Sequence, residues 1–152
     1  SCFEWDASVP MIIAPPKLSK PGASTHALAE LLDLYPTIVE LAGLPKPKHL
    51  EGASLLPVLG NPAASVKQAA YTQHPRPAYY KGGPEAMGYS IRIAAMRYTE
   101  WRDWKTGKII ARELDDHRKD PGENHNIAAA QAGVLRKLSG RLGGQFPVRA
   151  HP

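Results

Sequence analysis

A short apolar run near the start of the chain, residues 9–14 (VPMIIA), constrains the fold more than any other feature. It is closed by Pro15 and Pro16, and its length is typical of a buried strand and not of a helix. A strand that is apolar on both faces needs a layer of structure on each side. A chain of 152 residues has difficulty supplying both layers. The run therefore indicates that this segment belongs to a larger fold.

An amphipathic helix is expected downstream, because apolar residues recur at spacings of three and four between residues 27 and 44. Pro36 interrupts this pattern. Proline is tolerated in the first turn of a helix and breaks a helix interior. We therefore expect the helix to begin near Asp33 or Tyr35 and to end at Gly43.

Alternating aromatic and β-branched residues predict several short strands in the second half of the chain. The expected strands cover residues 69–73, 88–93, 96–101 and 108–114. The second and third of these read as a hairpin, and the fourth follows a turn as the next antiparallel strand. A helical turn at residues 54–60 precedes them. After a turn at residues 120–123, helical spacing over residues 127–138 predicts a terminal helix.

Charge and cysteine content exclude several function classes. The net charge of +5 is spread along the chain, and its longest basic cluster is only Arg136 and Lys137 with Arg141. No nucleic-acid-binding motif is present, so a nucleic-acid partner is not expected. No apolar run approaches the roughly 20 residues that span a bilayer, so no membrane partner is expected either. The single cysteine, Cys2, excludes an intrachain disulfide.

The sequence carries no recognisable catalytic or metal-binding motif of its own. Its six histidines are dispersed, without His-x-x-x-His or His-Glu-x-x-His spacing. Cys2 is expected to be a small, partly buried thiol. We therefore assign neither a catalytic residue nor a metal ligand to this chain.

Five short stretches occur in an order and at spacings that, taken together, are typical of one protein family. They are residues 9–13 (VPMII), 31–43 (LLDLYPTIVELAG), 50–57 (LEGASLLP), 111–114 (AREL) and 120–123 (DPGE). In order and spacing these stretches resemble the C-terminal half of sulfatases. Residues 71–77 (YTQHPRP), and 87–92 (MGYSIR) running into 97–101 (RYTEW), narrow the resemblance to the iduronate-2-sulfatase-like branch.

The resemblance implies an α/β fold of the alkaline-phosphatase type. Residues 1–62 would form the C-terminal end of the large α/β domain. Residues 63–152 would form a smaller C-terminal subdomain with an antiparallel sheet and a terminal helix. By the same resemblance, the complete protein is a sulfuric ester hydrolase, located in the periplasm, the lysosome or outside the cell.

Sulfatases of this family use a calcium ion and a formylglycine made from the first residue of a Cys/Ser-x-Pro/Ala-x-Arg motif. Cys2 does not stand in such a motif, because Phe3, Glu4 and Trp5 follow it. In the family the nucleophile and the calcium ligands lie before the strand that residues 9–13 resemble. The chain is therefore expected to bind neither group, to be inactive alone and to need the N-terminal catalytic portion as its partner.

Recognition of a sulfated carbohydrate substrate is the role that the resemblance leaves to this chain. Residues 71–77 correspond to a loop near the active-site mouth, and Arg76 lies there between two prolines that stiffen it. A guanidinium meets carboxylate or sulfate oxygens with two hydrogen bonds. His74 and Lys81 are further candidates. An arginine that ties its own loop to a carbonyl or carboxylate explains Arg76 equally well.

Other residues of this region are interpreted as structural. Arg92 and Arg97 are expected to be exposed cross-strand charges, and the aromatic residues Tyr89, Tyr98 and Trp101 to pack. Relatives commonly carry an aromatic residue where this chain has Asp115 and Asp116, which predicts an exposed strand end.

Two alternatives remain at this point. The chain could be a binding module for acidic glycans without catalysis, or part of a phosphoesterase of the alkaline phosphatase superfamily. The second half carries no chemistry that separates sulfate from phosphate, so the missing N-terminal motif would decide between the two esterases.

Overall fold

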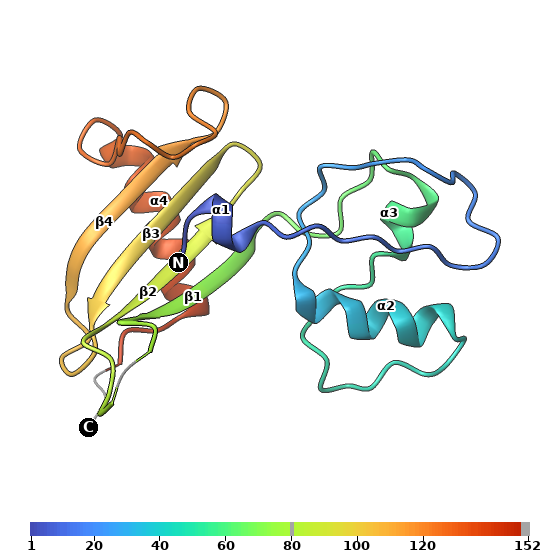
Figure 1. Cartoon of the computed structure of the whole chain (residues 1–152), viewed down its shortest axis with the longest axis horizontal. Coiled ribbons are helices and arrows are strands. Elements are labelled where there is room, and N and C mark those ends of the chain that lie inside the picture. The colour runs from blue at the N-terminus through green and yellow to red at the C-terminus, as the bar shows by residue number, and fades with distance from the viewer. Residues whose placement is uncertain (80, 150–152) are drawn as a thin grey trace. The chain divides into compact units, whose positions relative to one another are not determined.

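The computed structural model describes residues 1–79 and 81–149 (Figure 1). Its contacts define two compact units: the sheet unit, Ser1–Val9 with Tyr71–Pro152, and the helical unit, Pro10–Ala70. Each unit buries apolar residues of its own. The predicted division after residue 62 concerns the place of these segments in a complete enzyme, and it stays a prediction.

A four-stranded sheet in the order β1-β2-β3-β4 forms the body of the sheet unit. Its strands are β1 (Ala70–Arg76), β2 (Ala86–Arg92), β3 (Met96–Asp103) and β4 (Ile109–Asp116). β2 pairs antiparallel with β3, where Ile91 lies opposite Tyr98, and β3 pairs antiparallel with β4, where Tyr98 lies opposite Leu114. The predicted antiparallel sheet is confirmed; β1, β3 and β4 end two or three residues beyond their expected ends, and β2 begins two residues before its expected start.

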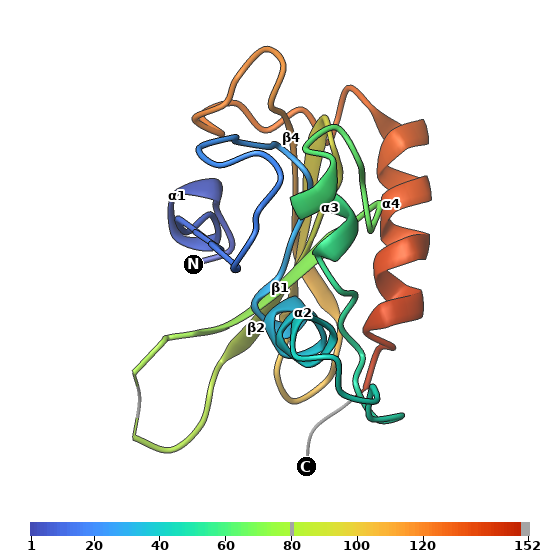
Figure 2. The ribbon, with the colours of Figure 1, turned by 90° about the vertical axis from the view of Figure 1, so that its right-hand side faces the viewer.

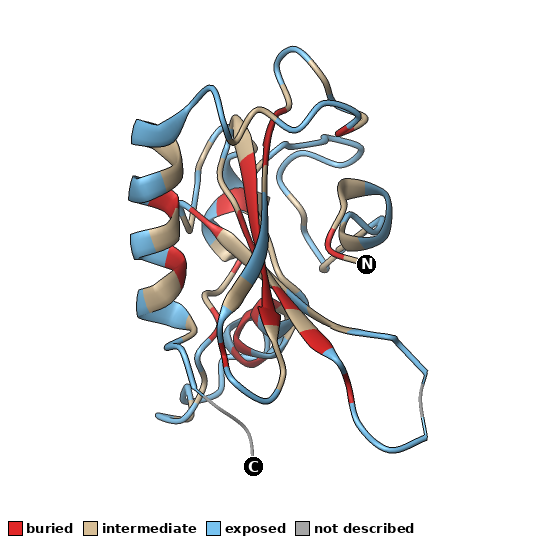
Figure 3. Ribbon diagram, turned by 90° about the vertical axis from the view of Figure 1, so that its left-hand side faces the viewer, coloured by how far each residue is buried: buried red, intermediate tan, exposed pale blue. Residues whose placement is uncertain are grey.

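The pleat of the strands gives this sheet two different faces. Helix α4 (Ala132–Gln145) packs on β2 and β3 on one side, and the short helix α1 (Glu4–Ala7) lies on the other side (Figure 2). We call these sides the helix face and the N-terminal face. Ile91, Tyr98 and Leu114 are fully buried on the same face of the sheet, together with Leu142 of α4. Figure 3 shows buried segments, in red, on the helix and on the strands that it covers. The terminal helix is confirmed, although it begins at Ala132 because turns occupy residues 127–130.

The helical unit contains a 3-10 turn, η1 (Leu31–Asp33), followed by α2 (Leu34–Leu41) and α3 (Leu56–Gly60). Pro36 lies in the first turn of α2, and Gly43 follows the helix with a φ of 67°, so the predicted helix is confirmed at both ends. No helix in the described part of the chain is long and apolar enough to cross a membrane.

A buried carboxylate holds the segments of the helical unit together. Asp33 accepts hydrogen bonds from the backbone N–H groups of Glu30 and Ala53, both at 2.8 Å, and it pairs with Lys67 at 2.6 Å. Burial alone would lower the pKa of Lys67, but its hydrogen bonds to Asp33 and Glu30 outweigh that effect and raise the pKa. The position of Asp33 makes it a scaffold residue.

The predicted strand at residues 9–14 is wrong for this chain. The segment is irregular, and Ile12 is 92% exposed. A strand exists only through hydrogen bonds to a neighbour, and among the described residues no strand pairs with this segment. Val9 and Ile12 are left exposed, whereas Met11 and Ile13 are partly buried.

Candidate functional site

The three predicted substrate residues belong to the connection between β1 and β2. His74 and Arg76 lie two residues apart at the end of β1 and share a face of that strand, and Lys81 lies in the following loop. The backbone N–H of Glu85 donates to the carbonyl of Arg76 at 2.9 Å and closes the base of the loop. Figure 2 shows this loop projecting away from the body of the sheet unit.

Arg76 is stacked on an aromatic ring. Its guanidinium carbon lies 3.8 Å from the centroid of the Trp101 ring, and Trp101 is only 3% exposed. Within the described part of the chain, no hydrogen bond or ion pair joins this guanidinium to a carbonyl or a carboxylate. A stacked guanidinium keeps its N–H donors in its own plane, where a planar or tetrahedral oxyanion can meet them.

His74 and Lys81 differ in their surroundings. The pKa of Asp6 lies below its usual value because the Ser1 hydroxyl and the terminal ammonium donate to it, and the charge of His74 adds a smaller contribution. His74 therefore lies near the N-terminal segment. Lys81 is exposed in the loop. The structure thus places His74 and Arg76 on one strand face, and Lys81 farther along the same connection.

A buried ion-pair cluster occupies the N-terminal face of the sheet, and sequence reasoning missed it. Arg97 is 3% exposed; its Nε donates to Glu123 Oε1 at 2.7 Å, and its Nη2 donates to Glu4. Arg92 donates to the same Glu4 carboxylate at 3.2 Å. The expectation of exposed cross-strand arginines is therefore wrong for Arg97, because the N-terminal segment and the turn at Glu123 cover this face.

The cluster also brings together three groups that could hold a metal ion. Glu4, His117 and Glu123 each offer a ligand atom within 4.8 Å of the others. However, the guanidinium of Arg97 already bonds both carboxylates, and Arg92 also pairs with Glu4, so two cations balance the two carboxylates. Burial alone would raise the pKa of Glu4, but the hydrogen bond and charge of Arg97, with Arg92, lower it. These residues do not fit a metal ion, since a fixed guanidinium takes the place of the cation.

The end of β4 is buried, so the prediction of an exposed strand end at Asp115 and Asp116 is wrong. Hydrogen bonds from Arg118 lower the pKa of Asp116 to about 2. Asp115 is 2% exposed, and its Oδ2 has no hydrogen-bond partner among the described residues. Burial raises the pKa of Asp115 to about 6, with smaller contributions from nearby carboxylates such as Glu123. The loop after β4 folds back over these carboxylates, a contact that the local sequence does not signal.

Cys2 is a buried thiol on the same face. Burial raises its pKa to about 11, which leaves it protonated near neutral pH. A thiolate and not a thiol is the reactive form of cysteine. Cys2 therefore fits neither a nucleophile nor the precursor of a formylglycine, as its sequence neighbours also indicate.

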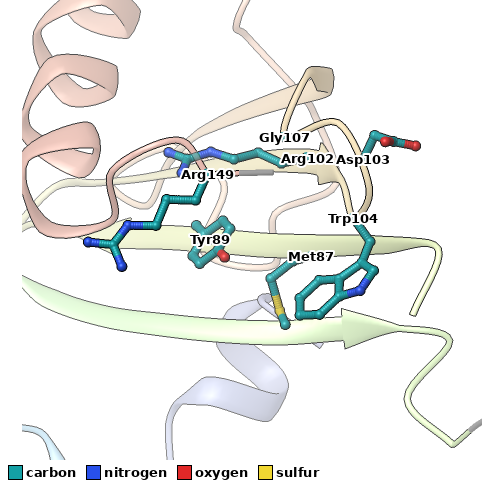
Figure 4. A pocket seen from close by; sticks show the side chains of 7 residues that line it. All are labelled: Met87, Tyr89, Arg102, Asp103, Trp104, Gly107 and Arg149. Atoms are coloured by element: carbon teal, nitrogen blue, oxygen red, sulfur yellow. The ribbon is translucent and has the colours of Figure 1, made fainter. Parts of the chain in front are cut away.

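A small pocket lies at one end of the sheet, beside the helix face (Figure 4). It is lined by Met87, Tyr89, Arg102, Asp103, Trp104, Gly107 and Arg149. The Arg102 guanidinium lies over the Tyr89 ring at 4.6 Å and bonds Glu100 at 2.9 Å. Its charge is therefore already paired, and none of the predicted substrate residues lines this pocket.

Comparison with known proteins gives the family of the chain. The family model described as N-sulphoglucosamine sulphohydrolase, C-terminal, matches residues 2–144, so the chain belongs to this family of sulfatase C-terminal domains. Arylsulfatase K of Rattus norvegicus is 33% identical over 145 residues, which cover 93% of this chain and 25% of that protein. Iduronate 2-sulfatase of Mus musculus is 31% identical over 158 residues, which cover 77% of this chain and 28% of that protein.

A solved structure shares the fold of this chain. A protein in complex with its substrate D-glucosamine-2-N,6-O-disulfate is 27% identical, with a TM-score of 0.55 over 75% of this chain and 24% of that one. The matches confirm the predicted resemblance to the C-terminal part of sulfatases and the alkaline-phosphatase-like fold class. The chain spans about a quarter of the length of these relatives.

Proposed function

We propose that the complete protein hydrolyses sulfate esters of a sulfated carbohydrate and that this chain supplies part of the substrate-binding surface. Arg76 is the principal contact, assisted by His74 and Lys81. The observation that carries the proposal is the exposed Arg76 guanidinium, which is stacked on Trp101 with its donors not engaged by described residues. The sulfatase family of the chain supports it.

The chemistry of the three residues suits an anionic sugar. Sulfated carbohydrates carry sulfate groups, and many carry carboxylates, whose oxygens accept paired hydrogen bonds from one guanidinium. The ammonium of Lys81 would act as a point charge in the loop. A structural relative is described with D-glucosamine-2-N,6-O-disulfate as its substrate, which is a ligand of this class.

The nucleophile and the metal ion belong, in this proposal, to an N-terminal catalytic portion. A formylglycine and a calcium ion there would supply the ester-cleaving chemistry. The described residues fit neither group, because Cys2 is a buried thiol with a raised pKa and the guanidinium groups of Arg97 and Arg92 already pair with Glu4 and Glu123. No catalytic residue is therefore assigned here.

The exposed apolar surface of the helical unit supports a covering N-terminal portion. Exposed apolar side chains are gathered on η1 and α2 at Leu31, Tyr35 and Ile38, and Ile38 is 61% exposed. Contiguous exposed apolar surface marks an interface. An Ile38→Glu change should lower the thermal midpoint of the complete protein and leave that of the 152-residue chain within about one degree. Equal shifts in both would contradict a covering portion.

The role of Arg76 is tested by kinetics on the complete protein. With D-glucosamine-2-N,6-O-disulfate as substrate, Arg76→Ala should lower kcat/KM by roughly tenfold or more, the loss expected for a charge-assisted contact. Arg136→Ala, an exposed arginine of α4, is the matched control and should have no effect. A decrease in kcat/KM of no more than about twofold for Arg76→Ala would contradict the proposed substrate contact of this residue.

The catalytic proposal has a separate test in the coding DNA. The reading frame upstream of Ser1 should encode a Cys/Ser-x-Pro/Ala-x-Arg motif and paired aspartates for calcium. An unrelated upstream sequence would contradict the sulfatase proposal. Binding of acidic glycans by this chain would then be the function to test. Turnover of p-nitrophenyl phosphate in preference to p-nitrophenyl sulfate would favour the phosphoesterase instead.

A further inference from the structure

We propose that Trp101 is a positioning residue that orients the Arg76 guanidinium toward the substrate. The inference rests on the proposed function, in which Arg76 contacts an anionic group of the sugar. Trp101 is buried in the sheet, so the proposal gives it no substrate contact of its own. It acts through the stack with Arg76.

The indole ring of Trp101 spans three strands. Trp101 on β3 lies opposite Gly88 on β2, and a Cβ at Gly88 would lie 2.8 Å from Cζ3 and 2.9 Å from Cη2 of the ring. The ring therefore occupies the space that a side chain at position 88 would need. Because the strand order is β1-β2-β3, a ring that crosses β2 in this way reaches Arg76 on β1. Glycine inside a strand commonly marks such a close approach.

Further contacts hold the ring in place. The indole N–H donates to Glu113 Oε2 on β4, with Nε1 and the oxygen 3.4 Å apart. The Sγ of Cys2 would lie 3.0 Å from a Cβ at Gly88, so the buried thiol packs beside the same glycine. Contacts on these sides fix the orientation of the ring. One of its faces is then available to the guanidinium.

A fixed ring under Arg76 reduces the conformational entropy that this side chain loses when it binds a ligand. A free arginine side chain loses much rotamer freedom when it engages a ligand. A guanidinium held over an indole face has already lost part of that freedom, and the cation–π attraction keeps its charge in place. Its N–H donors stay in the guanidinium plane, and no described residue accepts from them. Loss of the ring should therefore leave the charge of Arg76 and remove its orientation.

The test is a double-mutant cycle in the complete enzyme. We expect Trp101→Leu to raise the KM for D-glucosamine-2-N,6-O-disulfate roughly tenfold with kcat within about twofold. The KM for p-nitrophenyl sulfate, which lacks a second anionic group, should not change. Trp101→Phe keeps an aromatic face and should restore most of the KM. In an Arg76→Ala background, Trp101→Leu should add nothing, because both changes remove one interaction.

Two outcomes would overturn the inference in different ways. If Arg76→Ala raises KM and Trp101→Leu does not, or if the two effects add, Trp101 has no positioning role and the proposed function of Arg76 stands. If Arg76→Ala has no effect, the role of Arg76 itself fails, and this inference fails with it. Should Trp101→Leu not fold, Gly88→Ala replaces it, since a single methyl there displaces the ring without removing it. The same non-additivity with Arg76→Ala is then required.

Discussion

The two faces of the sheet each bury a carboxylate–guanidinium pair, and the two pairs are built differently. On the helix face Glu100 and Arg102 stand two residues apart on β3 and pair at 2.9 Å. Tyr98 and Ser139 donate to the same carboxylate, at 2.9 and 2.5 Å. This pair is formed within one strand and is covered by one helix.

The N-terminal face depends instead on segments that are distant in sequence. Arg97 bonds Glu4, which lies 93 residues away, and Glu123, which lies 26 residues away. Asp115 remains buried there with one oxygen unpartnered among the described residues. The comparison teaches that a pair within one strand needs no other segment to bring its two charges together, whereas a cluster of separate segments ties the stability of this face to its loops. The Arg76–Trp101 stack lies on this second face.

The largest effect should follow from breaking the cluster at its centre. Arg97→Ala leaves the buried Glu123 carboxylate without its guanidinium partner, whereas Arg92 still pairs with the partly exposed Glu4. The change is expected to cost about 3–5 kcal/mol of unfolding free energy. Urea denaturation measures it, with the exposed Arg136→Ala as the control. A cost below about 1 kcal/mol would mean that water or another residue replaces the guanidinium.

The helix face should respond to loss of packing. Leu142→Ala removes a fully buried side chain from α4, and a large-to-small change of this kind costs roughly 3 kcal/mol. Lys137→Ala on the exposed side of the same helix should be nearly neutral. If the two variants have the same thermal midpoint, α4 does not stabilise the sheet through Leu142.

A pH-dependent effect should distinguish Asp115 from its neighbours. Burial raises its pKa to about 6, so the folded state binds the proton more tightly than the unfolded state does, and stability falls as the pH rises from about 4 to 6. Asp115→Asn removes this penalty and should stabilise the protein by about 2 kcal/mol at pH 7.5. The gain should vanish near pH 4. A gain that is constant between pH 4 and 7.5, in urea denaturation at each pH, would contradict the raised pKa.

The smallest expected effect is on the chemical reactivity of Cys2 and not on the stability of the protein. Cys2 is the single cysteine of the chain, and burial raises its pKa to about 11. Ellman's reagent should therefore react with the folded protein far more slowly than with protein in urea. Comparable rates in both states would show that the N-terminal segment opens readily from the sheet.

Much of the secondary structure could be predicted because it follows from short-range patterns. The β2–β3 hairpin was predictable from alternation, since a slip of one residue would turn Ile91 and Tyr98 away from α4. Pro36 and Gly43 likewise set the ends of α2 through their own backbone preferences. The predicted strand at residues 9–14 failed because a strand needs a partner that the described residues do not provide.

The candidate site was only partly predictable. Arg76 was singled out by its place between two prolines, but its stack on Trp101 depends on the strand order and on the missing side chain at Gly88. The prediction of exposed charges at Arg97 and Asp115 failed for a related reason. Whether a charge is buried depends on segments that fold over it from elsewhere in the chain.

By itself the sequence determined the sheet strands, the helix after Pro36, the terminal helix, the pairing of the hairpin and the sulfatase family, because propensity, periodicity and motif order are local properties of a chain. Only the tertiary structure decided which charges are neutralised and which remain available. Arg97 and Arg102 pair with buried carboxylates, whereas Arg76 is held on a ring and its donors bond no described residue. The physical reason is that electrostatic pairing depends on the distance between two charges in space, which cannot be obtained from their separation along the chain.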